Sequence, residues 1–195
     1  ALAMPAEHQG QEVAGGLGVD RGERLVEQDQ PRVLQEQAGE QDPLQLAARQ
    51  RADRLVERTR FAEHSRESFE AMLDAANQLA SSEFATHNRA GDLNEPAFDG
   101  ERVRLIPEIK RALDAFAAAG FLAMTPDAEH GGLQLPTVIE KAVFAHFCAA
   151  NIATSGYPFL TIANANLLLA HGSAAQIERF ARPQLVGRFF GTMCL

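Results

Sequence analysis

Histidine and cysteine are the residue types in this sequence that could hold a metal ion or serve in nucleophilic catalysis. The histidines do not pair at the spacings of metal ligands, and no set of cysteines or carboxylates completes a site. No serine or cysteine lies in a nucleophile elbow or beside a base in the sequence. The histidines concerned are His64, His87, His130, His146 and His171. The local motifs therefore name no catalytic residue.

The glycine pair Gly131-Gly132 could suggest a phosphate-binding loop. Such loops need several glycines between a strand and a helix, whereas this pair lies between two predicted helical segments. We therefore expect a turn that requires positive φ.

Polar residues interrupt an apolar stretch near the end of the chain, where a helical core would usually carry leucine or isoleucine. They are Thr154, Ser155, Tyr157, Thr161, Asn164 and Asn166. A buried amide without partners costs about 1–3 kcal/mol, so hydrogen bonds between helices are one explanation. The other is that the small side chains leave room for a ligand between the helices.

The elements that must position these residues are helices. An apolar stripe predicts an amphipathic helix from Ser65 to about Asn88, and the glycines and prolines that follow predict a loop over 91–100. Further helices are expected over 107–120, over 137–152, from Tyr157-Pro158 to Ala170, and after a cap at Ser173. Together these helices predict an all-α helical bundle.

For two of these helices the sequence allows more specific predictions. The helix 159–170 is apolar all round, which is typical of the centre of a bundle. In the last helix, Ile177 and Phe180 should face the core, and Pro183 should break or kink the final turns.

Both ends of the chain differ from its middle. Residues 1–54 are rich in glutamine and glycine and lack aromatic residues, which predicts a poorly ordered or loosely helical leader. Residues 189–195 belong to an apolar, β-prone run, so we expect a fragment that stops at the first strand of a β-domain. The helical domain then spans 55–188.

Composition excludes two classes of function. The 195 residues include 18 Lys plus Arg and 26 Asp plus Glu, a net charge of −8, which argues against a nucleic-acid binder. No apolar stretch approaches the roughly 20 residues that span a bilayer. Two cysteines, Cys148 and Cys194, fit buried thiols in a reducing cytoplasm.

Several segments, in consistent order from about Leu55 to Leu195, resemble the N-terminal helical domain of bacterial acyl-CoA dehydrogenases. They are Phe61–Glu67, Glu95–Arg102, Glu129–Pro136, Ser155–Thr161, His171–Ser173 and Gly187–Leu195. The most similar subgroup includes long-chain enzymes and 3-methylmercaptopropionyl-CoA dehydrogenases. The resemblance implies a flavoprotein oxidoreductase of fatty acid β-oxidation that binds FAD between its middle and C-terminal domains. It also implies an acyl-CoA substrate, an electron-transferring flavoprotein as acceptor and a homo-oligomer.

The same resemblance assigns roles to residues of this chain. Met193 and Leu195 match flavin-lining positions, with Cys194 pointing away between them. Phe159, Ile162, Ala163 and Asn166 correspond to the wall of the acyl pocket, within one helical turn. The catalytic base of the family is usually a glutamate far downstream, so no glutamate here inherits that role. The chain alone is expected to be inactive, and a non-catalytic helical interaction module that kept the fold is the alternative.

Overall fold

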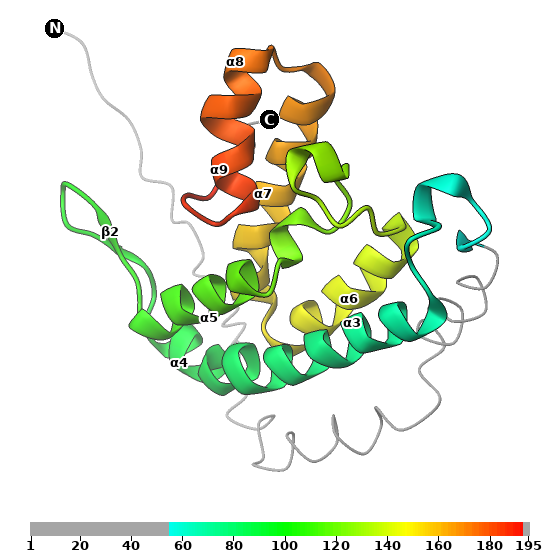
Figure 1. Cartoon of the computed structure of the whole chain (residues 1–195). Coiled ribbons are helices and arrows are strands. Elements are labelled where there is room, and N and C mark those ends of the chain that lie inside the picture. Colours follow the sequence, from blue (N-terminus) through cyan, green and yellow to red (C-terminus); the bar gives the residue numbers. More distant parts are fainter. Residues whose placement is uncertain (1–54, 193–195) are drawn as a thin grey trace, which may run out of the picture. The chain divides into compact units, whose positions relative to one another are not determined.

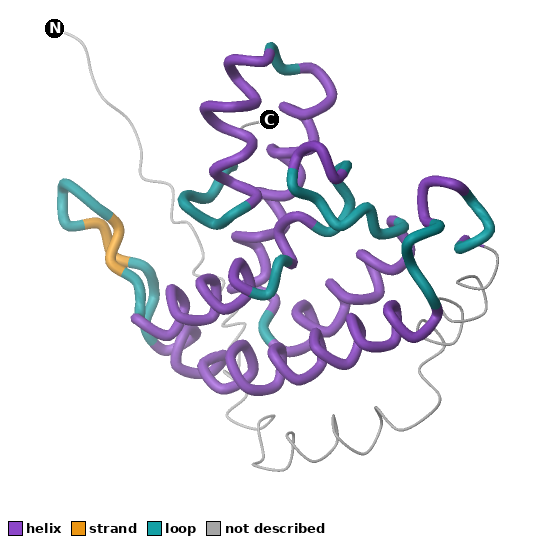
Figure 2. Tube along the Cα trace, viewed as in Figure 1, coloured by secondary structure: helices purple, strands orange, loops and turns teal. Residues whose placement is uncertain are grey.

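Helices dominate the computed structural model, which describes residues 55–192 (Figures 1 and 2). The α-helices are α3 (Arg66–Leu79), α4 (Asn88–Leu93), α5 (Pro107–Ala118), α6 (Thr137–Ala150), α7 (Ile152–His171), α8 (Ala174–Gln176) and α9 (Arg182–Leu185). Short 3₁₀ turns lie at Thr59–Phe61, Ala85–His87, Phe121–Ala123 and Ala128–His130, and π-helical segments at Ala80–Phe84 and Ile177–Ala181. The predicted all-α fold is confirmed.

Helix α3 forms where its capping residue and apolar stripe predict it. The Ser65 hydroxyl accepts a hydrogen bond from the Ser68 backbone N–H, and the Ser68 hydroxyl accepts one from the Ser65 N–H. Phe69, Leu73 and Ala76 are buried along one face. The helical path then continues through the π segment and a 3₁₀ turn into α4.

A β-hairpin occupies part of the region predicted to be a loop. Helix α4 extends to Leu93, and the strands β1 (Ala97–Phe98) and β2 (Val103–Arg104) then pair antiparallel. The Asp99 carboxylate accepts hydrogen bonds from the backbone N–H groups of Glu101 and Arg102 at 3.0 and 2.9 Å and from Arg104 Nε at 2.9 Å. The loop prediction was wrong here because two-residue strands are too short to show alternation. In Figure 1 the hairpin projects from the ends of α4 and α5.

An aromatic cluster forms the core between α3, α5 and α6. The Phe147 ring lies 4.7 Å from that of Phe116 and 4.9 Å from that of Phe84, both edge-on. Phe121 completes the cluster at 5.3 Å from both Phe116 and Phe147. All four side chains are fully buried. Edge-to-face rings add about 0.5–1.5 kcal/mol per pair beyond the area they bury.

Helix α7 begins earlier than predicted, at Ile152 rather than Tyr157. The Asn151 side chain caps it by accepting from the Thr154 N–H at 3.0 Å, so Pro158 lies inside the helix instead of at its start. The expectation that this helix occupies the centre of the bundle is also wrong for the described residues. Phe159 is 53% exposed and Leu167 47% exposed, because only one side of α7 is covered.

The last helical segment begins where the sequence predicts, but its apolar side chains are more exposed than predicted. Ser173 caps α8 in a capping box with Gln176, as predicted. Phe180 is 41% exposed and Ile177 only half-buried, so the prediction that both face the core was wrong. The helix widens into a π turn directly before α9, which contains Pro183, and α9 ends at Leu185. Proline supplies no N–H to the preceding turn, in keeping with the predicted disturbance.

Candidate functional site

Helix α7 carries all four residues predicted to form a ligand wall. Phe159, Ile162, Ala163 and Asn166 follow the spacing i, i+3, i+4, i+7, which places them on one face of the helix. Burial varies along this face: Ile162 is 8% exposed and belongs to the core, whereas Phe159 and Asn166 are exposed. The Phe159 ring lies 6.0 Å from that of Phe144 on α6. The structure thus brings the four together, and their role in binding stays a prediction.

A buried hydrogen-bond network holds the first turn of α7. His87 Nδ1 lies 2.7 Å from the Glu83 carbonyl oxygen, which can only accept, so this nitrogen carries the proton. In the neutral ring Nε2 then accepts from the Thr154 hydroxyl at 2.8 Å. Asn151 Nδ2 donates to the Phe84 carbonyl at 3.2 Å, and the Ser155 hydroxyl donates to the Asn151 carbonyl at 2.8 Å. The bonds of Thr154 to His87 and of Asn151 to Phe84 attach α7 to the π segment and the 3₁₀ turn that follow α3.

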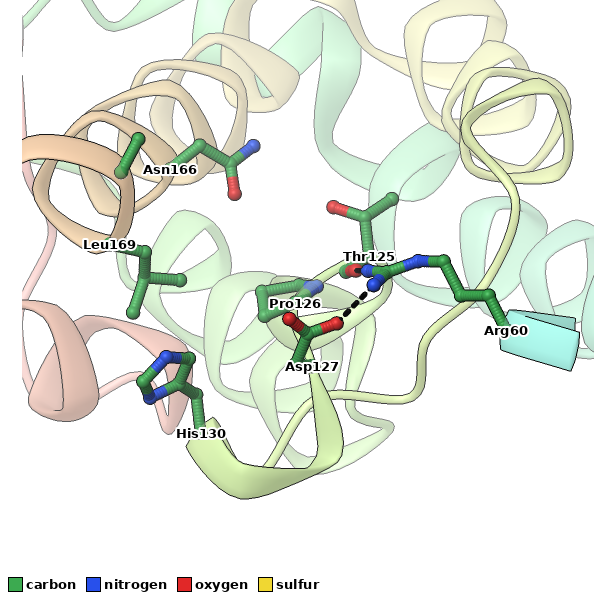
Figure 3. Close-up of a pocket in the computed structure, with 8 residues that line it drawn as sticks. Arg60, Thr125, Pro126, Asp127, His130, Asn166 and Leu169 are labelled. Carbon is green, nitrogen blue, oxygen red and sulfur yellow. Dashed lines mark hydrogen bonds and ion pairs between the residues drawn. The ribbon is translucent and has the colours of Figure 1, made fainter.

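A pocket of about 270 Å³ opens beside the C-terminal half of α7 (Figure 3). Arg60 forms an ion pair with Asp127 at its edge and donates from Nη2 to the Thr125 carbonyl at 3.2 Å. His130 Nδ1 is buried without a hydrogen-bond partner among the described residues. The lining residues are Arg60, Thr125, Pro126, Asp127, His130, Asn166, Leu169 and Ala170. Asn166 therefore belongs both to the predicted wall and to this pocket.

The loop that lines the pocket is fixed by its glycine pair. Gly131 has φ +80°, which confirms the predicted turn of positive φ. A Cβ at Gly132 would lie 2.0 Å from the Pro126 carbonyl oxygen, so only glycine fits there. Backbone hydrogen bonds from Leu133 to Ala123 at 2.8 Å and from Leu135 to Met124 at 2.7 Å close the loop.

Two side chains from elsewhere in the chain also hold this loop. His64 Nε2 donates to the Leu133 carbonyl at 2.8 Å, and Arg182 Nη2 donates to the Glu129 carbonyl at 3.3 Å. The pocket wall is thus built by Arg60 before α3, by the loop and by α7, and Arg182 supports the loop from the last helix. Sequence reasoning missed Arg60, Asp127 and His130 as lining residues, because only the fold brings positions more than 60 residues apart together.

Residues 190–192 lie against α7 without forming a strand. Gly191 and Thr192 are held by side chains of α7 instead: the Gly191 N–H donates to Thr161 Oγ1 at 3.1 Å, and Asn164 Nδ2 donates to the Thr192 carbonyl at 3.2 Å. The strand predicted over 189–195 is absent from its described part, 189–192, because these residues have no partner strand there. Met193 and Leu195 lie outside the described residues.

Most polar residues of α7 find protein partners. Thr154, Ser155, Thr161 and Asn164 each make at least one hydrogen bond within the described residues. Of the two explanations that the sequence left open, hydrogen bonds between helical segments account for Thr154, which contacts His87, and for Asn164, which contacts Gln184. Ser155 and Thr161 instead donate to carbonyls in the cap and body of α7 itself. Asn166 differs, because it is exposed and lines the pocket.

Three further features of residues 55–192 bear on metal binding, membrane insertion and thiol chemistry. No group of three or more His, Cys, Asp or Glu residues in this range is placed to hold a metal ion. No helix there is long and apolar enough to cross a membrane. Cys148 is half-buried, and burial raises the pKa of its thiol, which keeps it protonated and a poor nucleophile at neutral pH.

Comparison with known proteins relates this chain to a protein family and to a curated relative. The family model for the acyl-CoA dehydrogenase, N-terminal domain, matches residues 66–188. The 3-methylmercaptopropionyl-CoA dehydrogenase of Ruegeria pomeroyi is 28% identical over 135 residues, which make up 69% of this chain and 23% of that protein. The chain thus spans about a quarter of the length of the curated relative that it matches.

Proposed function

Because the chain belongs to the acyl-CoA dehydrogenase N-terminal domain family, we propose that it is the helical N-terminal part of an FAD-dependent acyl-CoA dehydrogenase. The reaction proposed is α,β-dehydrogenation of an acyl-CoA thioester. The Ruegeria pomeroyi relative is a 3-methylmercaptopropionyl-CoA dehydrogenase, and the match covers 23% of its length. In this proposal residues 1–54 are a leader, 55–188 the helical domain, and 189–195 the start of a middle β-domain.

The observation that carries the proposal is the face of α7 formed by Phe159, Ile162, Ala163 and Asn166. Its side chains are apolar except for one amide, which suits an acyl chain. Phe159 is also exposed enough to touch a ligand or a neighbouring domain. A wall of this kind excludes water while charge builds on the thioester oxygen, and exclusion of water strengthens the electrostatic stabilisation of that charge. The carboxylate base is proposed to come from a later part of the enzyme.

The chemistry of residues 189–195 fits the flat, largely apolar ring system of a flavin. Phe189 and Val186 are exposed apolar side chains beside the segment that leads to Met193 and Leu195, the proposed lining residues. When bound, FAD supplies the acceptor for the hydride that leaves the β-carbon. In this proposal the role of this chain is to offer apolar side chains to the flavin and to hold in place the backbone that carries these side chains.

Partners and location follow from the family in the same way. We propose that electrons pass to an electron-transferring flavoprotein, that the enzyme is a homo-oligomer, and that it works in fatty acid β-oxidation in the cytoplasm. Acyl chain length is the property to be measured, because α7 alone forms only one wall of the pocket.

The test is to read the gene beyond the codon for Leu195 and to purify the protein encoded by the whole reading frame. We expect a yellow protein that reduces an artificial electron acceptor when given long-chain acyl-CoA or 3-methylmercaptopropionyl-CoA. A reading frame that stops there, or a full-length protein without flavin, would overturn the proposal. Either result would favour a non-catalytic helical module.

A further inference from the structure

Residues 92–105 form an arm in which every residue is exposed. The arm holds β1 and β2 and projects from the ends of α4 and α5 (Figure 1). A two-stranded hairpin that packs on nothing else is only marginally stable in water. A second surface laid against the arm would supply the burial that it lacks.

The two faces of the hairpin differ in chemistry. In the antiparallel register Phe98 lies opposite Val103 and Ala97 opposite Arg104, so each pair shares one face. The face of Ala97 and Arg104 finds a partner within the hairpin, because Arg104 Nε donates to the Asp99 carboxylate at 2.9 Å. The other face is apolar and open to solvent, with Phe98 68% exposed and Val103 56% exposed.

We propose that a second copy of this chain docks on the apolar face of the hairpin, with the two hairpins packed face to face across a two-fold axis. In such an isologous contact each Phe98 packs against Val103 of the other copy. The inference rests on the proposed function only in assuming a homo-oligomer, to which it gives a location on the described residues. It depends on neither the flavin nor the reaction.

The distribution of charge favours a second copy as the occupant. The chain has a net charge of −8, so two copies repel each other unless the surfaces that meet are uncharged or carry both signs. The apolar face brings no charge into the contact. At the tip, Glu101 and Arg102 are exposed and lie outside the ion pair of the hairpin, so each copy offers both signs to the other. An anionic lipid surface would instead repel the acidic group at the tip.

The apolar area of the arm fits a weak dimer. Leu93 and Leu105 lie at the base of the arm and are 69% and 38% exposed. Together with Phe98 and Val103 they expose on the order of 400 Å², or about 800 Å² over two copies. That total lies below the roughly 1,200–2,000 Å² of standard interfaces, so we expect a dissociation constant in the micromolar range or weaker.

The experiment measures self-association of the 195-residue chain by sedimentation equilibrium, from micromolar to millimolar concentration. Phe98→Glu places a charge on the apolar face, and Ala97→Glu places the same charge one residue earlier, on the other face. We expect F98E to weaken the dimer about 100-fold, because its carboxylate would be buried without a partner, and A97E to change the dissociation constant less than about threefold.

Two NMR measurements complete the test. The Arg102 amide, which donates to Asp99 at 2.9 Å, reports whether the hairpin is intact in each variant. Should F98E lose the hairpin, Phe98→Ala takes its place, with about tenfold weakening expected. In a mixture of isotope-labelled and unlabelled wild-type chains, we expect a nuclear Overhauser effect between the Phe98 ring of one copy and the Val103 methyl groups of the other.

A chain that stays monomeric at millimolar concentration overturns the proposal. So does a dimer that F98E and A97E weaken equally, or one without the contact between Phe98 and Val103 of different copies. A monomeric chain that binds phosphatidylglycerol vesicles through Phe98 assigns the face to lipid, and a monomeric full-length protein with a protected hairpin assigns it to a later domain. Both results overturn the second copy. A dimer with these contacts in a full-length protein without flavin overturns the proposed function and leaves this inference standing.

Discussion

The region formed by α3, α5 and α6 buries its aromatic side chains more completely than the region formed by α7 and the helix that follows it. Between α3, α5 and α6, Phe84, Phe116 and Phe147 are fully covered and contact one another. On α7 and the helix that follows, Phe159 and Phe180 remain about half exposed. The first region is held together by apolar packing. The second combines a smaller apolar cluster around Ala165 and Leu185 with hydrogen bonds from side chains to backbone.

Removing a core ring tests this comparison most strongly. Phe116→Ala should lower the free energy of unfolding by about 3–5 kcal/mol, through lost apolar burial and the cavity that remains. Phe180→Ala should cost about 1 kcal/mol or less, even with its contact to Arg179 at 5.4 Å. Urea unfolding followed by circular dichroism measures both. Equal losses for the two variants would show that the regions do not differ as described.

A second comparison is between Gly132, which is closely surrounded by other atoms, and Gly156, which has open space around it. Gly132→Ala should destabilise the protein by about 3 kcal/mol, because its Cβ would overlap the Pro126 carbonyl. Gly156→Ala in α7 meets no atom within 4 Å and should stabilise the protein by about 0.5–1 kcal/mol. Thermal unfolding of the two variants should move the melting temperature in opposite directions, and shifts of the same sign would contradict the geometry.

The hydrogen bonds of His87 connect the two regions. His87→Ala should cost about 2 kcal/mol, because the Glu83 carbonyl and the Thr154 hydroxyl both lose their partner in a buried site. His64→Ala removes a histidine that donates a single exposed hydrogen bond and serves as the matched control, with an expected loss below 1 kcal/mol. The assay is chemical denaturation at pH 7. If the H87A protein is as stable as the H64A protein, the hydrogen bonds of His87 do not hold the two regions together.

The hairpin should show the smallest effect, and it depends on pH. The backbone N–H of Arg102, the Arg104 side chain and the Glu101 N–H hold the pKa of Asp99 below its ordinary value. Its charge therefore stabilises the hairpin above the unfolded pKa of about 3.9, and this is lost as pH falls through the lower folded value. The Arg102 amide chemical shift, followed from pH 6 to pH 2, should titrate below pH 3.9. D99N should abolish the titration, and a transition above that pH would contradict the assignment.

Local signals in the sequence predicted the fold well. Ser65 and Ser173 form caps where predicted, Pro107 begins α5, and Gly120 follows it with φ +81°. Each depends on interactions within a few residues. The start of α7 was misplaced because a Tyr-Pro pair resembles a helix start, whereas the true cap at Asn151 also bonds to Phe84 far away in sequence.

The candidate site was predictable only in part. The resemblance to a family pointed to Phe159, Ile162 and Asn166, and their spacing puts them on one face of α7. The exposure of Phe180 and the pocket contacts of Arg60 depend on tertiary packing, which no local pattern encodes. The roles of Met193 and Leu195 remain predictions, because these residues lie outside the described range.

Pro158 divides α7 into two mechanical parts. Lacking an N–H, it leaves the Thr154 carbonyl without its usual helical donor, so the rigidity of the helix is lowest at this turn. The turns before it are attached to the π segment after α3, and the turns after it line the pocket. We therefore expect a joint within a single helix, at which α7 can bend while Ile162 keeps its second half packed on the core.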